Sequence, residues 1–157
     1  MARPLIPVLL AVLAIAGCSR EVENDLRVID VRSGWFDAGI VDGQNKLVPS
    51  ISLRLENVSD RAIDRVQLNA VFKRVGEEEM WGSHLASGIG PEGLEPGATS
   101  APIVLRSPLG YTGPQARMQM LQNKEFVDAT VEVFGKHGSR TWIRINETQI
   151  DRQLLTE

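Results

Sequence analysis

Apolar and polar side chains alternate with a period of two along most of the chain after residue 25, and this pattern constrains the fold more than any other feature. Residues 51–56 alternate without interruption, and residues 66–73 do so nearly as regularly. Successive side chains on a β-strand point to opposite faces, so each of these segments is expected to bury one face. The polar residues 57–61 between them are typical of a turn, and we expect the two strands to pair as a hairpin.

Seven segments are predicted to be strands, and one to be a helix. The strands cover residues 26–32, 51–56, 66–73, 80–85, 101–106, 126–134 and 141–146. The last two are expected to form a hairpin that turns at 135–139, and residues 75–79 lead into another hairpin at 80–85. Residues 114–123 begin with proline and continue with good helix formers, which predicts a short helix over one end of the fold.

Seven short strands in about 130 residues predict an all-β fold, an immunoglobulin-like antiparallel sandwich that spans residues 26–157. Trp81 and Trp142 are both candidates for the aromatic anchor of its core, and the sequence does not choose between them.

Residues 48–106 resemble the immunoglobulin-like repeats of bacterial envelope lipoproteins, such as the FxLYD-type domains. The resemblance is carried by the Asn-Val-Ser turn at 57–59, the strand that ends in Phe72, Gly76, and the Leu-Glu-Pro-Gly loop at 94–97. It implies a fold and a location in the cell envelope, and it implies no activity.

The N-terminus has the organisation of an export signal. Arg3 is followed by residues 5–16, which carry no charged or polar side chain. Twelve residues of helix reach about 18 Å, well short of the roughly 30 Å hydrocarbon core of a bilayer, so a cleaved signal is expected rather than a membrane span. Ile15-Ala16-Gly17-Cys18 is similar to a lipobox, which predicts cleavage between Gly17 and Cys18.

Cys18 is therefore expected to carry the lipid anchor. It is the chain's single cysteine, so no disulfide can form within the chain. The alternatives are a secreted protein with a chance cysteine and a buried free thiol. Residues 18–25, the lipidated cysteine and a polar stretch, are expected to be a spacer too hydrophilic to pack.

The mature chain would have 140 residues and 20 acidic against 16 basic side chains. This acidic balance argues against nucleic acid as a partner. Acyl chains would attach the protein to a membrane that faces the periplasm. Ser19 after the cysteine favours the outer membrane if the organism has two membranes.

Side chains that could perform catalysis are scarce, and we expect no enzymatic activity, no metal and no cofactor. His84 and His137 are expected to be solvated or half-buried. Glu77, Glu78 and Glu79 are consecutive, so their carboxylates would alternate in direction and form a solvated charge run. Residues 37–43 lack the intermediate acidic positions of a calcium loop.

Two features are candidates for a binding surface. Trp35 and Phe36 open an apolar stretch, residues 35–41, in the predicted connection between the first two strands. That stretch either closes the core or meets a partner. Tyr111 lies between two glycines in a predicted loop, which could present its ring as a contact.

These features predict a lipid-anchored envelope protein that acts as a non-enzymatic interaction or structural module, with a protein partner bound through loops or an exposed strand edge. The alternative is a lipoprotein that binds a small molecule, a glycan or a metal through the loops at 35–41 and at Tyr111.

Overall fold

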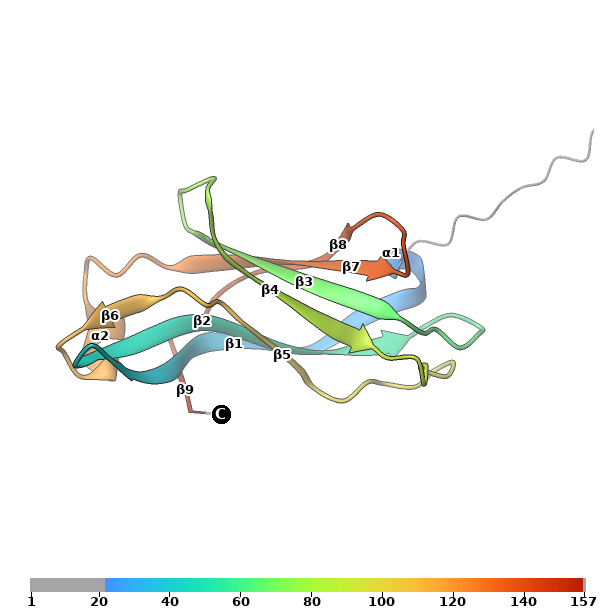
Figure 1. Ribbon diagram of the computed structural model, residues 1–157, viewed down its shortest axis with the longest axis horizontal. Coiled ribbons are helices and arrows are strands. Elements are labelled where there is room, and N and C mark those ends of the chain that lie inside the picture. The colour runs from blue at the N-terminus through green and yellow to red at the C-terminus, as the bar shows by residue number, and fades with distance from the viewer. Residues whose placement is uncertain (1–21, 157) are drawn as a thin grey trace, which may run out of the picture.

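The computed structural model describes residues 22–156, which form two β-sheets packed face to face (Figure 1). The all-β sandwich predicted from the sequence is confirmed, with more strands than expected. The elements in chain order are α1 (Val22–Asp25), β1 (Leu26–Val41), β2 (Gln44–Asn57), β3 (Val66–Arg74), β4 (Met80–Ile89), β5 (Ile103–Arg106), β6 (Tyr111–Gly113), α2 (Arg117–Gln122), β7 (Ala129–His137), β8 (Ile143–Gln149) and β9 (Leu154–Leu155). One sheet has the order β5-β2-β1-β9, with β6 also paired to β2, and the other has the order β4-β3-β7-β8.

A long hairpin of β1 and β2 forms the centre of the first sheet. Val41 pairs with Gln44, so only Asp42 and Gly43 make the turn. Both turn residues have positive φ, 50° for Asp42 and 77° for Gly43. This is the conformation that two-residue hairpin turns require, and Asp-Gly is among the pairs that adopt it most readily. The dipeptide is thus the local signal for this hairpin.

The predicted hairpin of residues 51–56 with 66–73 is wrong, because β2 and β3 lie in different sheets. The polar residues between them form a connection that crosses from one sheet to the other. Asn57 at the end of β2 is fully buried, and its side-chain amide donates to the carbonyl oxygens of Arg61 and Leu94, each at 2.7 Å. These bonds hold the connection against the β4–β5 loop instead of folding it back as a tight turn.

Residues 35–41 do not form the predicted loop but belong to β1. The strand has irregular register at two places, between Ile29 and Arg32 and between Asp37 and Ile40. At the second, the N–H of Gly39, with φ of 85°, donates to Oδ1 of Asp37 at 2.9 Å. An extra residue in a strand reverses the faces of the side chains that follow, so the bulges interrupt the alternation that identifies strands.

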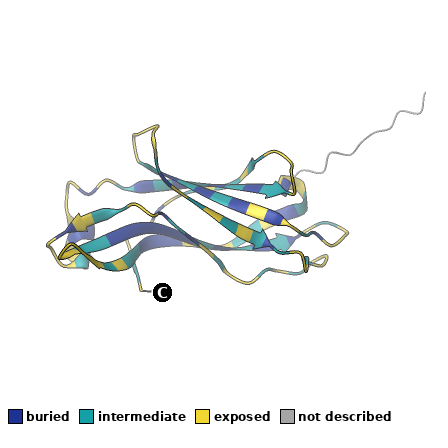
Figure 2. Ribbon diagram, in the orientation of Figure 1, coloured by how far each residue is buried: buried dark blue, intermediate teal, exposed yellow. Residues whose placement is uncertain are grey.

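The core lies between the inner faces of the two sheets (Figure 2). Trp35 is its largest fully buried side chain, whereas Trp81 and Trp142, the two predicted anchors, are only partly buried. The other fully buried large side chains come from both sheets: Leu47, Ile51, Leu53, Leu55, Val66, Leu68, Phe72, Leu105, Val131, Val133 and Ile150.

Both ends of the described chain pack on the sandwich. Val22 in α1 is 6% exposed and belongs to the core, so the expectation of an unpacked spacer is wrong for residues 22–25, and residues 18–21 lie outside the described residues. At the other end, β9 pairs with β1 in parallel through Leu154 opposite Trp35, a pairing that the sequence did not reveal.

The helix α2 is shorter than the predicted segment 114–123. It buries Met120 and Leu121 against the core, in agreement with the prediction that this helix covers one end of the fold. None of the helices in residues 22–156 is long and apolar enough to cross a bilayer.

Candidate functional site

Four aromatic side chains pack together near one end of the sandwich, and two of them are residues that the sequence proposed for binding. Trp35 lies with its ring centroid 4.6 Å from that of Phe126, 5.6 Å from Tyr111 and 6.2 Å from Trp81. The indole N–H of Trp35 is buried with no hydrogen-bond partner among the described residues, so packing holds the ring. Because Trp35 is fully buried, it cannot contribute to an exposed binding surface.

Tyr111 does not lie in an open loop but in β6, opposite Leu47 of β2. Its ring is half-buried between Trp81 and Phe126, with centroids 4.9 Å from each. The hydroxyl donates to the carbonyl oxygen of Val127 at 3.2 Å, and burial raises the pKa of Tyr111 above its usual value of 10.0. The tyrosine therefore closes the edge of the aromatic cluster and retains only a partly accessible face.

Phe36 points to the opposite face of its sheet from Trp35, because neighbouring residues of a strand alternate in direction. The guanidinium of Arg106 lies over the Phe36 ring, 3.6 Å from its centroid. Stacking of this kind is a favourable contact between a cation and an aromatic face. Phe36 and Tyr111 consequently belong to separate parts of the surface and do not form the single binding surface that the sequence suggested.

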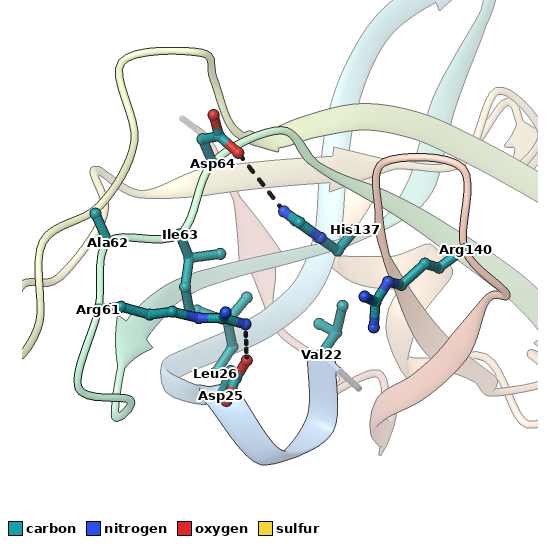
Figure 3. A pocket seen from close by; sticks show the side chains of 9 residues that line it. All are labelled: Val22, Asp25, Leu26, Arg61, Ala62, Ile63, Asp64, His137 and Arg140. Carbon is teal, nitrogen blue, oxygen red and sulfur yellow. Dashed lines mark hydrogen bonds and ion pairs between the residues drawn. The ribbon is translucent and has the colours of Figure 1, made fainter. Parts of the chain in front are cut away.

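A pocket lies at the end of the molecule where the described chain begins (Figure 3). It has a volume of about 210 Å³. Its lining comes from three segments distant in sequence: α1 and the start of β1, the β2–β3 connection, and the end of β7 with the turn that follows it. The lining residues are Val22, Asp25, Leu26, Arg61, Ala62, Ile63, Asp64, His137 and Arg140.

The pocket has an apolar floor and a charged rim. Val22, Leu26 and Ile63 are 5–6% exposed and form the floor. On the rim, Arg61 faces Asp25 at 3.5 Å and His137 Nε2 faces Asp64 at 3.6 Å, the two interactions drawn in Figure 3. Arg61 and Asp25 therefore join opposite charges across a long distance, and His137 and Asp64 are both partly exposed.

Each of the two histidines contacts other protein groups of the fold. Nδ1 of His84 lies 3.0 Å from both the N–H and the carbonyl oxygen of Arg106, so the ring bridges β4 to β5 of the other sheet. His137 lies on the pocket rim, far along the chain from His84. Within residues 22–156, no three His, Cys, Asp or Glu side chains gather in a way that could hold a metal ion.

Several acidic residues form ion pairs at the surface, and others are simply exposed. Glu77, Glu78 and Glu79 are exposed in the β3–β4 turn, as expected for a solvated charge run, and Glu77 pairs with Arg74 at 2.8 Å. A network that the sequence did not reveal lies on the outer face of the second sheet. There Glu132 accepts from Lys73 at 2.9 Å and from Arg144 at 2.7 Å, and these hydrogen bonds lower the pKa of Glu132.

The outer edge of β4 is a long stretch of backbone that the described strands leave unpaired. Among the described residues, β3 is the only strand that pairs with β4. The strand runs for ten residues, Met80–Ile89, longer than the predicted 80–85, and none of its side chains is charged apart from the titratable His84. Leu85 in its middle is 62% exposed. The alternation of 80–85 predicted this strand, but only the topology shows that it forms an edge.

Cys18 and Gly17, the predicted lipidation and cleavage residues, lie outside the described residues 22–156.

The fold defines the class of this protein as a two-sheet, all-β sandwich. No family model and no curated protein matches the chain. Two solved structures are similar in outline. One is an X-ray structure of a Northeast Structural Genomics Consortium target, with 11% identity and a TM-score of 0.46 over 83% of this chain and 89% of that one. The other, a structural-genomics target from Bordetella pertussis named as a candidate ApaA protein, has 16% identity and a TM-score of 0.47 over 82% of this chain and 94% of that chain.

Proposed function

We propose that this chain is a lipid-anchored envelope protein whose sandwich acts as a non-enzymatic protein-interaction or structural module at the periplasmic surface of a membrane. The observation that carries this proposal is Ile15-Ala16-Gly17-Cys18 at the end of an uncharged apolar stretch. Small residues before the cleaved bond and a thiol after it are what cleavage and acylation require.

The start of the fold is compatible with short tethering. Val22, the first described residue, already packs in the core, and only three residues separate it from Cys18. An extended chain spans at most about 3.6 Å per residue, so Cys18 lies within roughly 15 Å of the sandwich. A lipid on Cys18 would thus hold the pocket end of the domain close to the bilayer.

The use of buried polar side chains favours a structural or binding role. Ser33 Oγ donates to Asp151 at 3.1 Å and accepts from the N–H of the same residue at 3.0 Å. Ser107 Oγ accepts from the N–H of Leu109 at 3.1 Å. Like Asn57, these side chains form hydrogen bonds to backbone groups and hold loops in place, which is the ordinary role of buried polar groups in a fold.

The alternative function, binding of a small molecule, glycan or metal through residues 35–41 and Tyr111, has less support. A pocket of about 260 Å³ borders Tyr111 and Phe126, but residues 35–41 belong to β1 and contribute nothing to its lining. The interaction hypothesis needs only an accessible surface, which the edge of β4 provides.

Lipidation is tested by Cys18→Ser in the full chain, with Ser19→Ala as the matched control. Growth with a labelled fatty acid and membrane fractionation should give a labelled, membrane-bound wild type and control. The Cys18→Ser chain should carry no label. A labelled Cys18→Ser chain would overturn the proposed anchor.

The interaction role is tested by crosslinking in intact envelopes, followed by purification of the chain in mild detergent. A reproducible crosslinked product is expected. Recovery of the uncrosslinked monomer alone would contradict the role.

A further inference from the structure

We infer that β4 pairs with β4 of a second copy of this chain, in antiparallel orientation about a twofold axis at Leu85. The two four-stranded sheets would then join into one continuous sheet. This inference adds to the proposed function the partner, a second copy, and the surface, the edge of β4. It rests on the proposed function for the membrane anchor of both copies.

Comparison of the sandwich edges singles out β4. Exposed edges are usually protected by charges, prolines or short length, because an unprotected edge accepts another strand. β5 has four residues and is flanked by Pro102 and Pro108, and β9 has two residues. β8 carries Arg144 and Glu147. The part of β1 that β9 leaves unpaired carries four charged side chains, Arg27, Asp30, Arg32 and Asp37. The ten residues of β4 include neither proline nor a permanently charged side chain.

The part of β4 available for pairing is regular. Its register with β3 shifts at two places, next to Val66 and next to Lys73, and between these shifts residues 82–87 pair without interruption. Six residues are close to the usual length of a strand in a globular protein. The shifts therefore limit the accessible edge to one short segment centred near Leu85.

The sequence of this segment is nearly symmetric about Leu85. Residues 82–88 read Gly-Ser-His-Leu-Ala-Ser-Gly, so the residues two and three positions away from Leu85 are identical on either side. A twofold interface places the same surface of each copy against itself, and it therefore requires a surface complementary to its own rotated image. A palindromic strand meets this requirement in antiparallel pairing.

The exposed side chains match in the same register. Ser83, Leu85 and Ser87 point outward and are exposed. With Leu85 opposite Leu85 of the second copy, each Ser83 lies opposite a Ser87. An apolar pair flanked by two hydroxyl pairs brings no like charges together, and cross-strand pairs of these kinds stabilise sheets.

The neighbouring strand β5 of the other sheet does not pair with the outer edge of β4. His84 points inward, where its Nδ1 lies 3.0 Å from the backbone of Arg106 in β5. The contact joins the two sheets through a side chain, and no β4–β5 strand pairing occurs in the described part of the chain. The backbone groups on the outer edge of β4 are thus not used by β5.

One strand pair buries little surface, so the dimer is expected to be weak in dilute solution. Confinement of both copies to a membrane raises their effective concentration. Antiparallel pairing places the two pocket ends at opposite ends of the joined strands, so both anchors reach one bilayer when the strands lie parallel to its plane. In that orientation the proposed anchor would strengthen the association without a new contact.

Site-specific disulfides in the full chain test the pairing and its register. Side chains directly opposite in an antiparallel pair have Cβ atoms about 4.5–5.5 Å apart, within adjustment of disulfide geometry. Leu85→Cys should therefore give a crosslinked dimer after mild oxidation in the envelope. Ser83→Cys alone should not, because the two copies of position 83 would be roughly 14 Å apart. The double variant Ser83→Cys, Ser87→Cys should crosslink again.

Two controls separate this inference from the proposed anchor. The wild-type chain reports any dimer formed through Cys18. Leu85→Cys combined with Cys18→Ser reports pairing without acylation. The inference is supported if either chain that carries Leu85→Cys forms a crosslinked dimer that the wild-type chain does not form. A chain that is labelled with fatty acid but yields no dimer with Leu85→Cys would overturn the inference and leave the anchor intact.

A charge substitution gives a second measurement. In the Ser83→Cys, Ser87→Cys chain, Leu85→Lys places two ammonium groups opposite one another and should abolish the crosslinked dimer in the envelope, whereas Ile40→Lys, at a 70% exposed position on β1, should not. Equal loss in both variants, or crosslinking of Leu85→Cys only to a different protein, would overturn the pairing of two copies.

Discussion

Trp35 and Phe126 meet edge to face, with ring centroids 4.6 Å apart and planes at 73°. Trp35 belongs to the centre of the first sheet, and Phe126 belongs to the segment that leads from α2 into β7 of the second. This contact joins the two layers near one end of the sandwich. Aromatic pairs in this geometry contribute more than the area they bury.

Trp35→Ala is expected to destabilise the fold strongly, because it leaves a large cavity in a fully buried site. Truncation of a core tryptophan typically lowers the free energy of unfolding by about 3–5 kcal/mol. Trp142→Ala, which removes a partly buried ring stacked on Lys136, should cost far less. Urea denaturation followed by circular dichroism measures both, and equal losses would contradict the role given to Trp35.

Asn57→Asp is expected to destabilise the crossing between the sheets. The amide of Asn57 donates to two carbonyl oxygens at 2.7 Å, and a carboxylate would place an acceptor against them. A buried polar group without its partner costs about 1–3 kcal/mol, and a charged group costs more. Asn24→Asp makes the same chemical change at an exposed position, and its melting temperature should stay near that of wild type.

Gly110→Ala is expected to displace β6 from β2. A Cβ at this position would lie 2.0 Å from the carbonyl oxygen of Leu47, and the central strand has no room to move. Such overpacking typically costs about 1–3 kcal/mol. Thr112→Ala, at an exposed position of β6, is the control, and faster amide exchange of β6 in Gly110→Ala alone would confirm the expectation.

Glu132 is expected to make the stability depend on pH in the acidic range. Hydrogen bonds from Lys73 and then Arg144 lower the pKa of Glu132 below its usual 4.5. A carboxyl whose pKa is lowered by folding stabilises the native state above that value, and this contribution is lost as the pH falls toward the folded pKa. Between about pH 7 and about pH 3, the urea midpoint should therefore fall less in Glu132→Gln than in wild type. An equal fall would contradict the network.

The strand content was predictable where alternation is continuous, as in residues 51–56 and 66–73. In β1 the alternation predicted a strand only over residues 26–32, because the bulges near Asp30 and Gly39 shift the pattern between faces. The two leucines of β9 are too short a segment for any periodicity. Asp42-Gly43 was a readable hairpin signal, whereas the polar residues after β2 look like a tight turn although they cross between sheets.

The class of the fold follows from the sequence, because a period of two requires strands with one buried face, and seven such segments require a second sheet to cover them. The predicted anchor at Cys18 is also read from a linear motif. The three-dimensional packing reveals which tryptophan fills the core, which strands are neighbours, and that β4 forms an open edge. These properties depend on contacts between segments far apart in the chain, and no local pattern encodes them.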